Sequence, residues 1–254
     1  MDIDSVFSAA AAERPCTLEL LLSRLSGQLR IAVLAPHPDD FDAIAITLRR
    51  FHARGDALHL AVLTTGASGV EHGYAGAIGD TEKGDVRETE QLASCAFFGL
   101  PREHITFMRL PPDAGGNPEL NASNHAVVRD WLQPLQAHLV FMPHGNDSNV
   151  THQRTYALFR GVAEKENLCL WALLNQDAKT LAIRHDVYTP FDAETAKWKA
   201  ELLRLHASQH QRNLNTRGHG FDERVLAVNR STAKTLRLSS EYAEAFEIER
   251  WPLA

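Results

Sequence analysis

The stretch Ile31-Ala32-Val33-Leu34-Ala35-Pro36-His37-Pro38-Asp39-Asp40 joins an apolar run directly to a cluster of ionisable residues. Residues 31–35 are rich in strand formers and stop at a proline, so they predict a short buried β-strand. Residues 41–53 then predict a helix. Residues 58–63 predict a second strand, which runs into the turn-rich segment 64–69, and apolar residues recur at helical spacing over 85–98.

The same alternation of strands and helices continues along the chain. We expect a strand at 105–108, a helix at 124–135 and a strand at 139–142. Parallel strands need crossover connections, so this order predicts a Rossmann-like α/β fold, with a mainly parallel sheet and helices on both faces.

The pattern changes after residue 165. Segments 168–174 and 181–188 look like neighbouring strands, and 193–210 predicts one long amphipathic helix. We interpret residues 166–254 as a small antiparallel C-terminal addition to a core of about 30–165. No linker or internal repeat interrupts the chain, so residues 1–254 are expected to form a single domain.

Composition excludes several classes of protein. The chain is 44% hydrophobic and 23% charged, with a formal net charge of −6, so neither nucleic acid nor an anionic membrane is an expected partner. No signal peptide is evident, and no apolar run reaches the ~18 residues that would predict membrane insertion. The 3 cysteines are far apart and form no Cys-x-x-Cys pair, which favours a cytoplasmic location. The sequence leaves open whether the chain forms homo-oligomers.

The first candidate site follows the first predicted strand, where His37, Asp39 and Asp40 lie within four positions. Ligands of doubly wound sheets bind beyond the carboxyl ends of the strands, so this is where a site is expected. Ionisable groups at this density need a compensating charge, and a divalent cation is one source of it. The alternative is helix capping by an aspartate, which accounts for only one of the two carboxylates.

The second candidate site is the segment Pro143-His144-Gly145-Asn146-Asp147-Ser148-Asn149-Val150-Thr151-His152, which follows the strand predicted at 139–142. Because it also lies at a carboxyl strand end, its side chains can converge with the first cluster. A catalytic zinc needs three protein ligands and one open position, which His37, Asp40 and one histidine of this segment would supply. The alternative is a polar loop with a capped helix start at Ser148 or Asn149, which does not exclude a metal.

Four stretches, in this order, resemble the PIG-L or LmbE-like N-acetylglucosaminyl deacetylases, and the likeness extends over residues 31–246. They are Pro36-His37-Pro38-Asp39-Asp40, Thr65-Gly66-Ala67-Ser68-Gly69, Arg87 with Glu90 ahead of Phe98-Gly99, and Lys199 through His206-Ala207-Ser208-Gln209.

The resemblance implies that His37, Asp40 and His152 bind Zn²⁺ and that Asp39 is the general base. A bound cation lowers the pKa of water and polarises a carbonyl, while a nearby carboxylate accepts the proton. Fe²⁺ or Co²⁺ could occupy the same ligands, because affinity alone does not select the metal. The resemblance also implies that Arg87 binds substrate hydroxyl or phosphate groups, and the alternative is an exposed helix arginine.

The second oxyanion donor is a point where the sequence departs from the family. Many members carry a histidine three residues before the metal histidine, and here that position is Asn149. Either Asn149 donates a neutral hydrogen bond to the oxyanion, or His144 reaches in from earlier in the segment. We favour His144.

The expected function is a zinc-dependent hydrolase that removes an N-acyl group, in particular N-acetyl, from an amino-sugar-like small molecule such as an N-acetylglucosamine derivative. One alternative is an amidase acting on a larger sugar or thiol conjugate. Another is a catalytically inactive metal-binding or sugar-binding protein, motivated by Asn149 and by Phe41, where the family usually has Glu. Asp39 argues against inactivity, because a pure ligand site has no use for a free carboxylate base. A dinucleotide-binding protein is disfavoured, since no Gly-x-Gly-x-x-Gly follows the first strand.

Overall fold

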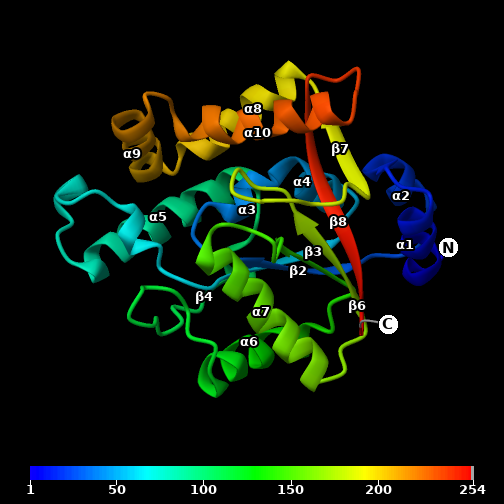
Figure 1. Cartoon of the computed structure of the whole chain (residues 1–254), viewed down its shortest axis with the longest axis horizontal. Helices are drawn as coiled ribbons and strands as arrows, with labels where there is room; N and C mark the ends of the chain where they lie inside the picture. Colours follow the sequence, from blue (N-terminus) through cyan, green and yellow to red (C-terminus); the bar gives the residue numbers. More distant parts are fainter. Residues whose placement is uncertain (253–254) are drawn as a thin grey trace.

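The computed structural model describes residues 1–252 as one mixed sheet with helices around it (Figure 1). The strands are β1 (Cys16–Thr17), β2 (Arg30–Ala35), β3 (Ala57–Val62), β4 (Ile105–Phe107), β5 (Leu139–Pro143), β6 (Leu170–Asn175), β7 (Val187–Phe191) and β8 (Tyr242–Trp251). The α-helices are α1 (Ile3–Ala12), α2 (Leu18–Arg24), α3 (Asp40–Ala43), α4 (Ala45–Ala53), α5 (Asp80–Phe98), α6 (Ala122–Leu135), α7 (Val150–Lys165), α8 (Ala193–Arg204), α9 (Ala207–Arg217) and α10 (Phe221–Thr235). Short 3₁₀ helices are η1 (Ala67–Gly69), η2 (Tyr74–Gly76) and η3 (Arg102–His104).

The strand order is β1-β7-β8-β6-β5-β2-β3-β4. Strands β4, β3, β2, β5 and β6 run parallel to one another, whereas β8 is antiparallel to both β6 and β7. The predicted Rossmann-like α/β fold with an antiparallel C-terminal part is therefore confirmed. The chain leaves β2 toward β3 on one side and later returns to β5 on the other, so a crevice is expected beyond the carboxyl ends of β2 and β5.

Side chains of β2 alternate between the two faces of the sheet. Ile31 and Val33 belong to the core that α1, α2, α4 and α5 cover, whereas Ala32 and Leu34 belong to the core under α6 and α7. This period of two explains why a strand buried on both faces is a continuous apolar run. The green helices α6 and α7 lie below the sheet in Figure 1, and α8 and α10 lie above it. Within residues 1–252, none of the helices combines the length and the apolar character that crossing a membrane requires.

The C-terminal strands differ from the prediction in position and pairing. Residues 181–186 are not a strand, and β7 begins only at Val187. Strands β6 and β7 are not neighbours either, because β8 lies between them and pairs with both. Since β8 comes more than fifty residues after β7, local patterns in the sequence do not reveal this pairing.

The prediction of one continuous helix over 193–210 is also wrong, because this segment breaks into α8 and α9 at Leu205 and His206. The segment contains neither glycine nor proline, so the cause is tertiary. Glu90 on α5 accepts hydrogen bonds from the backbone N–H of Ser208 at 2.6 Å and from its hydroxyl at 2.7 Å. A carboxylate at these first N–H groups stabilises a new helix start.

The helix predicted at 41–53 breaks at Ile44 into α3 and α4. The Glu244 carboxylate of β8 accepts hydrogen bonds from the N–H groups of Ile46 and Thr47, at 3.1 and 2.7 Å, and so caps α4. Lys199 of α8 neutralises this buried carboxylate, with its Nζ 2.6 Å from Glu244 Oε1. The break leaves α3 as a single short turn that begins at Asp40 in the candidate site.

Candidate active site

The turn after β2 holds Asp39 in an unusual backbone conformation. Asp39 has φ 122°, a region that non-glycine residues adopt at a cost of ~1–3 kcal/mol. The turn is fixed from α5, because Gln91 Oε1 accepts the Asp39 N–H at 2.9 Å and the Arg87 guanidinium donates to the Pro38 carbonyl. Backbone strain of this kind is a feature of functional sites, and here it places the Asp39 carboxylate at the wall of a cavity.

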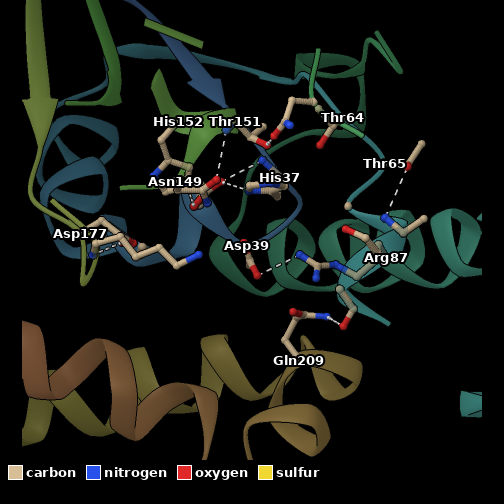
Figure 2. A pocket seen from close by; sticks show the side chains of 18 of the residues that line it. His37, Asp39, Thr64, Thr65, Arg87, Asn149, Thr151, His152, Asp177 and Gln209 are labelled. Carbon is tan, nitrogen blue, oxygen red and sulfur yellow. Dashed lines mark hydrogen bonds and ion pairs between the residues drawn. The ribbon is translucent and has the colours of Figure 1, made fainter. Parts of the chain in front are cut away.

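Three of the predicted site residues converge on one point. His37 Nδ1 lies 3.2 Å from Asp40 Oδ2, and His152 Nε2 lies 3.6 Å from Asp40 Oδ1. One ligand atom from each of the three residues lies within 4.8 Å of the other two. The ends of β2 and β5 therefore bring together residues that are more than a hundred positions apart in the sequence (Figure 2).

His152 is surrounded by carboxylates. Its Nδ1 lies 3.3 Å from Asp147 Oδ2, and Asp177 from the loop after β6 completes a second group that could hold a cation. Burial lowers the pKa of His152, but Asp40 and Asp147 outweigh that effect and raise it to about 9. The carboxylates around the ring therefore favour positive charge at this point of the site.

The chemistry of these donors fits a divalent cation. Burial tends to raise the pKa of Asp40, but the neighbouring His152 and His37 outweigh this and hold the pKa well below its ordinary value, so the carboxylate is ionised. Two imidazoles and one ionised carboxylate are a ligand set of catalytic zinc sites and also suit Fe²⁺ or Co²⁺. Asp147 fits an orienting role better than ligation, because Oδ1 already accepts the Asn149 N–H at 2.6 Å.

Asp39 is not part of the ligand group and contacts Arg87 instead. Its Oδ2 lies 2.9 Å from Arg87 Nη2, and the Arg87 side chain is only 2% exposed, so Arg87 is not an exposed helix arginine (Figure 2). Burial raises the pKa of Asp39 above its usual value, and Arg87 only partly offsets that effect. A carboxyl with a raised pKa and a fixed orientation suits proton transfer near neutral pH.

The structure places the two candidate oxyanion donors differently. The His144 Nε2 faces Glu247 Oε2 at 3.3 Å, its Nδ1 accepts the Asn146 N–H at 2.9 Å, and the residue does not line the cavity. Asn149 does line it and is the N-cap of α7, as the capping alternative predicted, with Oδ1 accepting the Thr151 N–H at 3.1 Å. Within residues 1–252, the Asn149 amide nitrogen donates no hydrogen bond and is free to meet a ligand.

These residues form one end of a cavity of about 670 Å³. The wall continues through η1 and the loop 112–117, and α9 and α10 close the opposite side. Figure 2 shows Gln209 of α9 across the cavity from His152, where Gln209 Nε2 donates to the Gly69 carbonyl at 2.9 Å. The volume is within the range of pockets for ligands larger than a single sugar ring.

The part of the chain that carries the candidate site matches a model of a known protein family. The family model described as PIG-L: GlcNAc-PI de-N-acetylase matches residues 32–163, slightly more than half of the chain. The chain belongs to the PIG-L family. The resemblance found in the sequence is thereby confirmed, and the PIG-L match includes His37, Asp39, Asp40, Arg87 and His152. No curated protein matches the chain.

Solved structures share the PIG-L fold at low sequence identity. An N,N'-diacetylchitobiose deacetylase from Pyrococcus horikoshii has a TM-score of 0.73 and 14% identity, covering 98% of this chain and 94% of its own. A 4-carboxy-2-hydroxymuconate hydratase from Pseudomonas putida has a TM-score of 0.64 and 16% identity, covering 86% and 95%. A teicoplanin deacetylase, in a zinc-inhibited form, has a TM-score of 0.62 and 14% identity, covering 87% and 98%. The fold is therefore found in deacetylases and in a hydratase, and does not by itself define the reaction.

Two carboxylates of this PIG-L site had no role assigned from the sequence. Asp147 lies five residues before His152, and its side chain is fully buried against the ring. An aspartate five residues before a candidate ligand histidine was a signal that the sequence contained. Asp177 had no such signal, because the loop after β6 reaches the site only through the packing of the sheet.

Asp147→Asn is expected to weaken metal binding by roughly 10–100-fold, the usual effect of losing a carboxylate that orients a ligand histidine. The amide keeps the shape of the side chain, but it does not stabilise the His152 ring as a carboxylate does. Titration of the metal-free protein with Zn²⁺ measures the change. Asp130→Asn, at an exposed position of α6, is the matched control. Unchanged affinity in Asp147→Asn would contradict the orienting role.

Proposed function

We propose that this PIG-L family member is a metal-dependent hydrolase that removes an N-acyl group, in particular N-acetyl, from an amino-sugar-like small molecule. One observation supports the proposal most strongly. The carboxylate of Asp39, which is held by Arg87 and is not part of the ligand group, lies beside the group His37, Asp40 and His152 at one end of a cavity. A site that only binds metal or sugar has no use for this separate, oriented carboxylate.

We propose that His37, Asp40 and His152 hold Zn²⁺, with Fe²⁺ or Co²⁺ as the other metals that suit these ligands. A cation bound there would lower the pKa of a water molecule and polarise the acyl carbonyl of the substrate. Asp147 keeps the Nε2 of His152 directed toward Asp40, because it binds the opposite ring nitrogen.

Asp39 is the proposed general base. With one oxygen bound to Arg87, the other is available to accept a proton from the attacking water and to pass it to the leaving amine. Arg87 fixes the direction of this carboxylate, and because it also lines the cavity we propose that it contacts substrate hydroxyl groups. Because Arg87 lies beside Asp39, it can contact only those substrate groups that are close to the scissile bond.

We propose Asn149, in place of the initially favoured His144, as the second oxyanion donor. The amide nitrogen of Asn149 is at the cavity wall, on the same helix turn as His152. His144 does not line the cavity and would have to leave Glu247 to serve this purpose. A neutral amide donor is sufficient, since amide side chains stabilise oxyanions in other hydrolases.

The cavity volume favours a substrate larger than a free monosaccharide, so an amino sugar that is part of a conjugate is within the proposal. We also propose a cytoplasmic location. The thiols of Cys16, Cys95 and Cys169 are unpaired, which is typical of proteins in reducing compartments.

The test is metal content of the purified protein together with acetate release from a panel of N-acetylated amino sugars and their conjugates. Near-stoichiometric metal and acetate release that a chelator abolishes would support the hydrolase. Metal without release of any acyl group from the panel would overturn the deacetylase proposal and would favour a binding role or the hydratase chemistry found elsewhere in this fold. Absence of metal binding would overturn the ligand assignment.

A further inference from the structure

The cavity has a surplus of basic side chains, although the whole chain has a formal net charge of −6. Its wall contains five lysines or arginines and four aspartates, of which Asp39 and Asp40 belong to the proposed catalytic machinery. A metal ion would add further positive charge. The basic residues are Arg87, Arg109, Lys179, Arg212 and Arg224.

Two of these five cations are neutralised within the protein. Arg87 is bound to Asp39, and Arg109 is bound to Glu88 through two hydrogen bonds of 2.6 Å. Among the residues that the structure describes, Lys179, Arg212 and Arg224 have no carboxylate within ion-pair distance of their side chains. These three residues form the basic roof of the cavity.

Two members of the basic roof, Arg212 and Arg224, lie on helices that carry none of the proposed metal ligands. Arg212 comes one turn after Gln209 on α9, the helix that lies across the cavity from His152 (Figure 2). Arg224 is on the face of α10 that lines the cavity, between Phe221 and Val228. His210 Nδ1 of α9 lies 3.2 Å from Asp222 Oδ1 of α10, so the two helices are in contact close to both arginines.

The surroundings of Arg224 strengthen its attraction for an anion. Its neighbours on the cavity face of α10 are mostly apolar and include Phe221, Val225 and Val228, so this part of the cavity offers few competing hydrogen-bond partners. Charge-assisted hydrogen bonds are stronger where water is excluded, and the planar guanidinium binds carboxylate or phosphate through two parallel bonds. Surplus positive charge in a cavity also speeds the arrival of anionic ligands.

We infer that the substrate of this site carries an anionic group, a carboxylate or a phosphate, on the part of the molecule remote from the scissile amide, and that Arg212 and Arg224 bind that group. Lys179, from the loop after β6, faces the same cavity and adds a third charge. The inference rests on the proposed function and refines it, because it specifies the chemical class of the conjugate.

The experiment compares three probes: N-acetylglucosamine, its 6-phosphate, and its 5-carboxypentyl glycoside, which carries a carboxylate at the end of the aglycone. Acetate release gives kcat/KM for each, and calorimetry on metal-loaded Asp39→Asn protein gives affinity independently of turnover. We expect the better anionic probe to bind at least tenfold tighter than the neutral sugar at low salt, with the advantage falling as salt rises. The preferred anionic probe shows whether the group is phosphate or carboxylate.

Arg212→Gln and Arg224→Gln, singly and together, are the diagnostic variants. The double variant should lose the tenfold preference and keep the affinity for the neutral sugar. Arg217→Gln is the matched control, since Arg217 is exposed on α9 and does not line the cavity.

The outcomes separate this inference from the proposed function. Anionic probes that bind no tighter than the neutral sugar, or a preference that survives the double variant, would overturn the anion site while deacetylation stands. No acetate release from any probe, with anion-selective binding that the double variant abolishes, would overturn the hydrolase and keep the anion site.

Discussion

Asp39→Asn is expected to retain its bound metal and to lose turnover by roughly 10²–10⁴-fold, the contribution of a positioned general base. The amide cannot accept the proton from the attacking water, but it can still accept the Arg87 hydrogen bond through its oxygen. Asn is also among the residues that best tolerate positive φ, so the strained turn should survive. Metal analysis and initial rates on the best substrate of the panel measure both parts of the expectation.

Asp80→Asn is the matched control for this variant. Asp80 is another aspartate that lines the cavity, at the start of α5, and it is exposed and has no contact with the metal ligands. Its rate should stay within a few fold of the natural chain. Near-normal turnover in Asp39→Asn would exclude Asp39 as the base, and loss of metal in that variant would show instead that the carboxylate supports the ligand site.

His152→Ala is expected to abolish stoichiometric metal binding. It removes a ligand and leaves Asp40, Asp147 and Asp177 without the ring that separates them. The loss in metal affinity should exceed the roughly 10–100-fold that we expect from Asp147→Asn, because a ligand is removed and not merely its support. Metal content after dialysis, measured by mass spectrometry, checks the result.

The control for His152→Ala is His72→Ala, since His72 is exposed and lies outside the cavity. Circular dichroism should show that both variants are folded, and His152→Gln, which keeps most of the side-chain volume, repeats the test if the alanine variant is unstable. Unchanged metal stoichiometry in a folded His152 variant would remove this residue from the ligand set.

The local sequence determined the parts of this protein that depend on nearest neighbours along the chain. The apolar run 31–35 predicted β2, because a strand buried on both faces needs apolar residues at every position. The order of strands and helices predicted the parallel sheet, since parallel strands need crossovers. The same logic predicted that the segment after β5 can converge with His37 and Asp40, because both segments begin at carboxyl ends of strands, whereas His152 itself was indicated by the family resemblance.

Only the tertiary structure decided what depends on residues far apart in the chain. Strand β8 inserts between β6 and β7, and its Glu244 breaks the helix predicted at 41–53 by capping α4. Arg87 is buried against Asp39, whereas an exposed position on α5 would give the same local sequence pattern.

Long-range packing also decides that Asn149 lines the cavity and His144 does not. Both follow β5, but the pairing of β8 with β6 brings Glu247 to His144, and Asn149 remains at the cavity. Short-range periodicity determines which segments form strands and helices, because it reflects which side chains must be buried. The direction of each polar side chain is decided by hydrogen-bond and ion-pair partners that only long-range packing supplies.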